Sequence, residues 1–249
     1  CRNTIILTCM SKRFIFIDTE TTGNGPDDVL CQIAYKYDDA VFEALYNPMR
    51  KIPPEASAVT HITNKMVADK PVFKESEEYI SVKKLLEDED SIFIAHNARF
   101  DVGMFDKEGV RPKNVICTLR LARHLDKEAK IPRYNLQFLR YYLEIEIEAQ
   151  AHDALGDVLV LEQLFPRLKD SLKKELATDD EEMIIKEMLA ISARPSILNA
   201  FNFGKHNGKK VSEVAKIDSG YLDWLLKQKL QNEGDDEDWI YTLKHYLGK

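Results

Sequence analysis

The sequence predicts an α/β fold in which helices flank a mixed β-sheet, followed by a small C-terminal accessory module. Three observations lead to this prediction. The first strand-like segments follow one another closely, which favours antiparallel pairing. Later strand-like segments alternate with helical ones, which is typical of a sheet covered by helices. After Pro195 the chain changes character, with turn-like runs such as Phe203-Gly204-Lys205 between aromatic helical segments.

The expected elements follow from the length and spacing of the apolar runs. Strands are expected near residues 14–18, 30–37, 41–47, 92–95 and 115–117. Helices are expected near 63–68, 75–87, 101–108, 118–125, 135–142 and 154–170, after a loop that contains Pro53 and Pro54. A helix-like stretch at 182–189 suits a linker. The predicted division is therefore a leader at 1–11, a first domain at 12–172, a helical linker at 173–195 and the C-terminal module at 196–249.

The composition limits the classes of protein that the chain can belong to. With 249 residues, 44% of them hydrophobic, it can bury a full core and a small second unit. No apolar run approaches the roughly 20 residues that span a bilayer. The chain begins without methionine, so we expect Met10 to be the natural start. The cysteines, at positions 1, 9, 31 and 117, lack metal-ligand spacing, which favours a reduced, cytoplasmic location.

The charge distribution bears on partners. The formal net charge of −7 argues against broad nonspecific binding to duplex DNA, which Lys and Arg drive through phosphate contacts. Basic residues gather before the third motif described below, and two interpretations apply: they guide a strand toward the site, or they form a solvated helix face. These residues are Arg120, Arg123, His124, Lys127, Lys130 and Arg133.

Two carboxylates end the first apolar run. Asp18 and Glu20 follow Phe14-Ile15-Phe16-Ile17, and because side chains alternate along a strand, both project from the same face. Two like charges at one strand end repel each other unless a cation lies between them. Hard divalent ions such as Mg²⁺ take oxygen ligands of this kind. The pair therefore predicts half of a metal site.

Two later motifs supply further acids. Asp101 closes the segment Asn97-Ala98-Arg99-Phe100-Asp101 after the strand near 92–95. His152 precedes Asp157 by five residues, a rotation of about 140° from the starting face of a helix, so the two cannot share one face. We expect His152 on a loop, Asp153 at the helix N-cap and Asp157 inside the first turns. A mobile imidazole then approaches a fixed carboxylate.

The order Asp-x-Glu at 18–20, Asn-x-x-Phe-Asp at 97–101 and His-x-x-x-x-Asp at 152–157 resembles the DEDDh 3′→5′ exonucleases. That family includes polymerase proofreading subunits, ribonuclease T, oligoribonuclease and exodeoxyribonuclease X. The resemblance covers roughly residues 12–170 and implies a ribonuclease H-like sheet. Phe-Gly-Lys-x-x-Gly-Lys at 203–209 and Asp-x-Gly-Tyr-Leu-x-Trp-Leu-Leu at 218–226 resemble the C-terminal module of exodeoxyribonuclease X-like proteins. Cys117 departs from the Asp that the family often has there, outside the carboxylate set.

The resemblance implies a mechanism and a set of ligands. Two Mg²⁺ or Mn²⁺ ions would be held by Asp18, Glu20, Asp101 and Asp157, with Asp18 bridging them. Glu20 would also approach the terminal 3′-hydroxyl, and His152 would take the proton from the attacking water. His96, beside the second motif, is expected to be structural.

The resemblance also implies contacts to the nucleic acid. The expected set consists of the backbone around Thr19, Thr21 and Thr22, a loop at His61 and Ile62, Phe100 under the terminal base and Asn97 in support. For the loop at 61–62, a packing role is equally open. Lys205, Lys209 and Lys210 either present a turn to a phosphate backbone or belong to a structural turn. Tyr221 and Trp224 have helix-core spacing and are expected in the core rather than as stacking platforms.

The predicted activity is metal-dependent 3′→5′ hydrolysis of DNA ends, with release of nucleoside 5′-monophosphates in replication or repair. The expected partners are single-stranded DNA with a 3′ end and proteins of replication or repair, with no membrane. Two alternatives stay open: an RNA exonuclease of the oligoribonuclease or ribonuclease T type, and an inactive nucleic-acid-binding module. The presence of all four carboxylates and His152 disfavours the inactive module.

Overall fold

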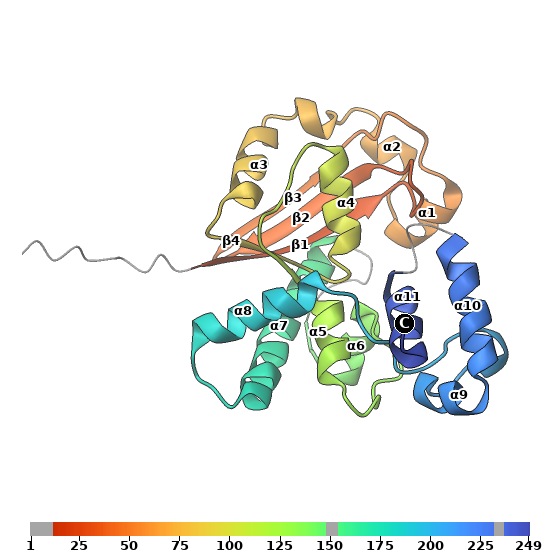
Figure 1. Cartoon of the computed structure of the whole chain (residues 1–249). Helices are drawn as coiled ribbons and strands as arrows, with labels where there is room; N and C mark the ends of the chain where they lie inside the picture. The colour runs from red at the N-terminus through yellow and green to blue at the C-terminus, as the bar shows by residue number, and fades with distance from the viewer. Residues whose placement is uncertain (1–11, 148–153, 232–236) are drawn as a thin grey trace, which may run out of the picture.

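The apolar run at the first motif forms the central strand of a five-stranded sheet (Figure 1). In the computed structural model, which describes residues 12–147, 154–231 and 237–249, the strand order is β3-β2-β1-β4-β5. The strands are β1 (Arg13–Thr21), β2 (Leu30–Tyr37), β3 (Ala40–Leu45), β4 (Ser91–Ala95) and β5 (Val115–Cys117). β1, β2 and β3 pair antiparallel, whereas β4 pairs parallel with β1 and with β5. The prediction of a mixed sheet is confirmed.

Alternating side chains of the buried strands build a core on each face of the sheet. Ile92 and Ile94 of β4 pack against the helices on one face, and Phe93 and Ala95 pack on the other. One face is covered by α3 (Tyr79–Glu87) and α4 (Arg99–Lys107). The opposite face is covered by α5 (Thr118–Leu125), α6 (Leu136–Tyr142), α7 (Ala154–Leu176) and α8 (Glu181–Ala193). The sheet is thus the middle of three layers (Figure 1).

The segment between β3 and α3 contains more helix than the sequence predicts. α1 (Pro54–Thr60) forms where a proline loop was expected, because proline suits the first turn of a helix, where its missing N–H is not needed. α2 (Asn64–Val67) forms within the expected 63–68. The helix expected at 75–87 is split into a single 3₁₀ turn, η1 (Phe73–Glu75), and α3.

The helix expected in the linker forms as α8 and belongs to the packed layer below the sheet. Ile184, Met188 and Ile191 lie in the same core cluster as Ile92 and Ile94. Asp180 caps α8, since its side chain accepts hydrogen bonds from the backbone N–H of Glu182 and Met183. We therefore use the name nuclease body for the described residues from 12 to 193. The domain boundaries predicted from sequence stay predictions.

The C-terminal module, residues 196–249, has a core of its own. It consists of η2 (Gly204–His206), α9 (Val211–Ile217), α10 (Ser219–Gln231) and α11 (Glu237–Leu247). Leu222, Leu225 and Leu226 turn the buried face of α10 toward Phe201 and Leu243. The prediction that Trp224 lies in the core is wrong: its position on α10 is off that face, and it is 53% exposed.

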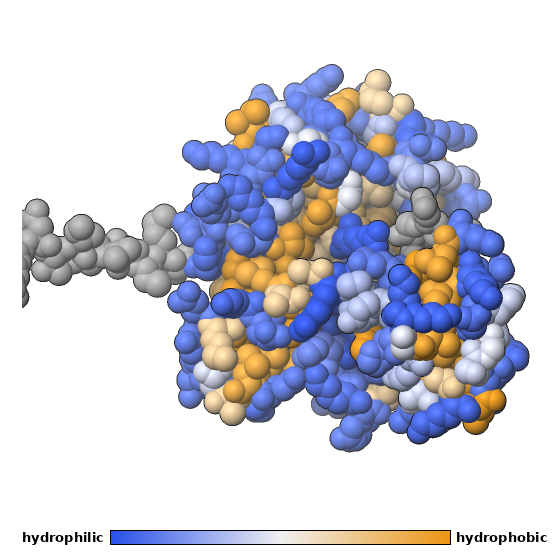
Figure 2. All heavy atoms as spheres, viewed as in Figure 1, coloured by the Kyte–Doolittle hydropathy of each residue, from blue (hydrophilic) through white to orange (hydrophobic). Residues whose placement is uncertain are grey.

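The surface reflects this division. Figure 2 shows hydrophilic residues over most of the visible face. Hydrophobic residues gather in one area above α8, in the nuclease body, and in another over α10 and α11, in the module. Exposed large apolar side chains of the module include Ile217, Trp224, Leu230 and Tyr241. Across residues 12–147, 154–231 and 237–249, the structure contains no helix with the length and apolar character that crossing a membrane requires.

Candidate active site

The parallel strands direct the functional residues to one edge of the sheet. β1, β4 and β5 run parallel, so their carboxyl ends meet at the same edge, where open α/β sheets commonly bind ligands. β1 places Asp18 and Glu20 near its carboxyl end, and α4 begins four residues after the end of β4. The first two motifs therefore lie at the same end of the sheet.

Acids reach the end of β1 from both faces of the sheet. On the α4 side, Thr19 donates a hydrogen bond from Oγ1 to Oδ1 of Asp101 at 2.7 Å. Asp18 and Glu20 share the opposite face with Phe16, which packs against Phe165 of α7. Asp157 lies in the first turn of that same α7. Two carboxylates of β1 are thus flanked by one from α4 and one from α7.

α7 is docked against the sheet by small side chains. Ala154 and Val158 pack on Ala34, the residue of β2 that pairs with Asp18. Asp157 lies three residues after Ala154, on nearly the same side of the helix, and is 9% exposed. Its Oδ1 accepts a hydrogen bond from Nε2 of Gln137 on α6. Gln137 is a site residue to which the sequence analysis gave no role.

The electrostatics of Asp101 differ from those of an ordinary surface acid. Asp101 is 3% exposed, and burial raises the pKa of its carboxyl to about 7, even though the hydrogen bond from Thr19 lowers it. Within the described residues, no three His, Cys, Asp or Glu side chains are grouped closely enough to hold a metal ion. Two of the four carboxylates are instead engaged by the neutral donors Thr19 and Gln137.

Comparison with known proteins assigns the family. A family model described as Exonuclease matches residues 15–165, and a second, described as Exodeoxyribonuclease X-like C-terminal, matches residues 201–229. Exodeoxyribonuclease 10 of Escherichia coli (strain K12) is 31% identical over 239 residues, covering 93% of this chain and 97% of the relative. The chain belongs to the DEDDh-type exonuclease family.

Solved structures agree with this membership. A structure described as Exonuclease X in complex with 5′ overhanging duplex DNA is 27% identical, with a TM-score of 0.54, covering 72% of this chain and 99% of that one. The nuclease domain of 3′hExo, a DEDDh family member bound to rAMP, shares the fold at a TM-score of 0.53, with 15% identity over 65% of this chain and 94% of that one. The predictions of the family, the ribonuclease H-like fold and a 3′→5′ exonuclease are confirmed.

The family also bears on metal and ligand. DEDDh exonucleases generally depend on divalent metal ions. Nucleic-acid binding and hydrolysis follow from membership in the family. His152 and Asp153, predicted as base and N-cap, lie outside the described residues.

His96 has the structural role that the sequence predicts. Its Nε2 lies 2.6 Å from the carbonyl oxygen of Tyr134 and therefore donates, while its Nδ1 lies 2.9 Å from Oγ1 of Thr118. Burial lowers the pKa of His96 to about 4, so the ring is neutral near pH 7. His96 thus ties β4 to α5 and to the segment before α6.

The predicted nucleotide contacts lie in varied surroundings. Thr19, Thr21 and Thr22 are buried, and their hydroxyls bond within the protein, to Asp101, Gly23 and Asp28, so only their backbone could meet a nucleotide. Ile62 is buried beside Cys31, Ile52 and Val67, whereas His61 is exposed in a left-handed conformation with φ of 59°. The side chain at 62 therefore packs in the loop.

The remaining predicted contacts are accessible. Asn97 is exposed with φ of 66° in the turn that starts α4, and Phe100 is half-buried against the core. In the C-terminal module, Lys205, Lys209 and Lys210 are all exposed. Lys205 forms an ion pair with Asp218 at 2.6 Å, and its Nζ lies 5.0 Å from the centre of the Tyr221 ring.

The basic residues before the third motif divide into two groups. Arg120 and Arg123 do not form a solvated helix face: they are 14% and 21% exposed and form ion pairs with Glu237 and Asp238 of α11. The sequence could not predict this pairing, because the partners are more than 110 residues apart along the chain. Lys127 pairs with Glu175, and Lys130 with Glu128, on the surface.

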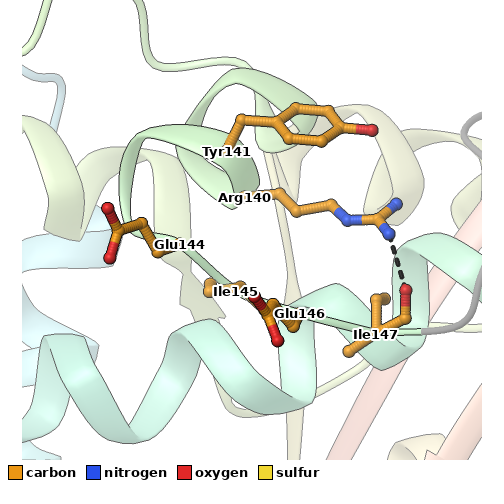
Figure 3. Close-up of a pocket in the computed structure, with 6 residues that line it drawn as sticks. All are labelled: Arg140, Tyr141, Glu144, Ile145, Glu146 and Ile147. Carbon is orange, nitrogen blue, oxygen red and sulfur yellow. Dashed lines mark hydrogen bonds between the residues drawn. The ribbon is translucent and has the colours of Figure 1, made fainter.

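A hollow lies at the end of α6 and along the segment that follows it in the chain (Figure 3). Its volume is about 530 Å³, and it is lined by Arg140, Tyr141, Glu144, Ile145, Glu146 and Ile147. Arg140 donates to the carbonyl oxygen of Ile147 at 2.7 Å, with the Tyr141 ring beside its guanidinium. These contacts hold the chain just before the segment that carries His152.

Proposed function

We propose that this exonuclease degrades DNA from its 3′ ends and releases nucleoside 5′-monophosphates. The observation that carries this proposal is the pair of family matches: the Exonuclease model in the nuclease body and the Exodeoxyribonuclease X-like model in the C-terminal module. A relative named Exodeoxyribonuclease 10 aligns over 93% of the chain, so the likeness includes both regions. The structural neighbour holds duplex DNA with a 5′ overhang, which is DNA with a recessed 3′ end.

Two Mg²⁺ or Mn²⁺ ions are the metals we propose, held by Asp18, Glu20, Asp101 and Asp157. The donor set fits hard divalent ions, since all four side chains offer carboxylate oxygens at one sheet edge. Asp101 supports the fit further: a buried carboxyl with a raised pKa carries a charge that the protein alone compensates poorly, and a neighbouring cation favours that charge. When bound, such ions activate water and stabilise the leaving 3′-oxygen.

The protein's own groups then have distinct tasks. His152, the first residue of the third motif, accepts the proton of the attacking water, a role suited to an imidazole whose ordinary pKa is about 6.5. Glu20 approaches the terminal 3′-hydroxyl. Thr19 and Gln137 orient Asp101 and Asp157 through the hydrogen bonds they donate. Gln137 and Thr19 are positioning residues in this proposal, because they act through the carboxylates.

The strand end is proposed to lie along accessible residues of the nuclease body. Asn97 and His61 are exposed and offer polar contacts, and the half-buried Phe100 offers a surface under the terminal base. The backbone at Thr19, Thr21 and Thr22 completes this set. Lys205, Lys209 and Lys210 of the C-terminal module would bind phosphates of a longer single strand.

The cellular setting is also a proposal. A cytoplasmic location is supported by Cys31 and Cys117, which are free, buried thiols among the described residues. Replication or repair proteins are the proposed partners, in keeping with a relative named DNA polymerase III PolC-type of Staphylococcus haemolyticus, 30% identical over 186 residues. That match covers 68% of this chain and 12% of the polymerase.

Digestion of matched DNA and RNA oligonucleotides with Mg²⁺ tests the proposal. With a 5′ label, a ladder of progressively shorter labelled products is expected on DNA, because removal begins at the 3′ end. Faster digestion of RNA would favour the oligoribonuclease or ribonuclease T type. Release of a labelled mononucleotide as the first product of a 5′-labelled strand would contradict the assigned direction.

A further inference from the structure

Three arginines face the C-terminal module at the sheet edge that carries the proposed active site. Arg99 is the first residue of α4, two positions before Asp101. Arg120 and Arg123 lie three residues apart on α5 and therefore share one side of that helix. α4 begins four residues after the end of β4, and α5 begins directly after β5, so both helices start at the carboxyl ends of these parallel strands.

Two carboxylates of α11 cover these arginines. Glu237 Oε2 lies 2.6 Å from Nη1 of Arg99 and 3.1 Å from Nη2 of Arg120. Asp238 binds Arg123 and lies 3.8 Å from Nη2 of Arg120. α11 thus begins with a pair of acids placed on the nuclease body, beside α4 and α5.

The two acids differ in how firmly they are held. Asp238 also accepts a hydrogen bond from the backbone N–H of Ser196 at 2.8 Å and is 24% exposed. Glu237 is 41% exposed, and within the part of the chain that the structure describes its side chain pairs with the two arginines. Asp238 and Arg123 therefore anchor the module, whereas Glu237 occupies an outer position from which another anion can displace it.

Arg99 and Arg120 have the properties of a phosphate site. Arg99 is 57% exposed, and Arg120 is held in place by the bond that its Nη1 donates to the carbonyl oxygen of Ser192 at 2.8 Å. A guanidinium matches the geometry of a phosphate as well as that of a carboxylate. We propose that Arg99 and Arg120 bind the phosphodiester backbone of a nucleic-acid strand, and that Glu237 occupies this site when no strand is bound.

This arrangement makes Glu237 a competitor of the substrate. When a strand enters along the sheet edge, one of its phosphates replaces the Glu237 carboxylate at Arg99 and Arg120. The ion pair between Asp238 and Arg123 keeps the module attached to the nuclease body during this exchange. The proposal rests on the proposed function only in that its ligand is nucleic acid. Its test therefore measures binding rather than cleavage.

Anisotropy of a short labelled single strand, measured in EDTA with the full-length protein, tests the site. Arg99→Gln should weaken the affinity about tenfold and flatten the slope of log affinity against log salt by about 0.7, through the loss of one phosphate contact. Glu237→Gln should strengthen binding by up to about fivefold, since it removes an exposed ion pair that competes. Arg99→Lys should retain the salt slope, because the charge remains.

The opposite signs of the two changes separate this proposal from a purely structural contact. If Glu237 and Arg99 only fastened the module, both variants would move the affinity in the same direction, and the proposal would be wrong. No change in either variant would also overturn it. Glu181→Gln is the matched control: it removes an exposed acid that pairs with Lys169, away from the module, and should leave binding unchanged.

Binding by the wild-type protein distinguishes failure of the proposed function from failure of the proposed phosphate site. If the wild-type protein binds neither DNA nor RNA strands of the same sequence, the proposed function fails. If wild type binds and the Arg99 and Glu237 variants bind equally well, only the phosphate site fails. Melting curves of each variant, compared with wild type, verify that the fold is kept.

Discussion

Two carboxylates, one in the nuclease body and one in the C-terminal module, lie in opposite environments. Asp101 of the nuclease body is 3% exposed, and burial raises the pKa of its carboxyl to about 7. Asp218 of the module lies at the surface, where hydrogen bonds from Lys205 and His206 lower its pKa to about 2. The first environment disfavours the charge that the side chain carries near pH 7, and the second favours it.

This difference in environment distinguishes an acid that serves a functional site from an acid that stabilises local structure. A buried acid that lacks a basic partner weakens the folded state, and such groups gather where a ligand later compensates the charge. An acid paired with Lys and His on the surface supports local structure instead. The two regions also differ in net charge. Residues 196–249 contain eight lysines and eight acidic residues and are neutral, so the formal net charge of −7 belongs to the rest of the chain.

The largest expected effect concerns the carboxylates of the nuclease body. Asp18→Ala should reduce exonuclease turnover to background, because removing a ligand disrupts the metal arrangement without removing core volume. Turnover on a labelled oligonucleotide with Mg²⁺ measures this. Asp218→Ala, in the module, is the matched control and should leave cleavage of short substrates unchanged. If the Asp18 variant turned over at the wild-type rate, the assignment of Asp18 as a metal ligand would be wrong.

A smaller loss is expected for the base. His152→Ala should lower the rate by about 10²–10⁴-fold, the usual size of general-base catalysis, while the stoichiometry of bound metal stays the same. Rates come from single-turnover digestion, and the stoichiometry comes from calorimetric titration with Mn²⁺. A collapse in stoichiometry would mean that His152 is a ligand, so the assignment of its role would have to change.

The module should affect affinity rather than chemistry. The double variant Lys209→Gln with Lys210→Gln should bind long single strands less tightly, with a salt slope flatter by up to about 1.4, as two phosphate contacts are lost. Cleavage of very short strands should stay near normal. Lys244→Gln, elsewhere in the module, serves as a control. An unchanged slope on long strands would assign these lysines to a structural turn.

The smallest effect expected is a pH dependence of stability that differs in sign between the regions. In EDTA, Asp101 should make the melting temperature fall as the pH rises from about 4 to about 7, because the folded state holds its proton longer than the unfolded state. Asp218 acts in the reverse sense: its stabilising contribution is present above about pH 4 and is lost as the pH falls toward about 2.

Two variants isolate these contributions. Asp101→Asn keeps an acceptor for Thr19 and should remove the loss of melting temperature between about pH 4 and about pH 7. Asp218→Asn should lower the melting temperature slightly near pH 7 and leave that loss in place. If the melting temperature of Asp101→Asn depended on pH as that of wild type does, the pKa of Asp101 would not be raised by its burial in the folded state.

The sequence by itself determined the three motifs, the mixed sheet and the presence of a second unit. These depend on local patterns: apolar runs of strand length, carboxylates at fixed spacing and the change in composition after Pro195. The order of Asp18, Glu20, Asp101, His152 and Asp157 was enough to indicate the exonuclease family, which the family match and the relatives confirm. The site residues themselves remain predictions.

Tertiary structure alone decided which residues meet across the chain. Gln137 reaches Asp157 because α6 packs beside α7, and Glu237 covers Arg99 and Arg120 because α11 begins against α4 and α5. Trp224 is exposed for a related reason: its spacing suits a helix core, but the leucines of α10 already fill the face that is buried. Local spacing sets the face of a helix, whereas the partner that covers that face depends on contacts between distant segments.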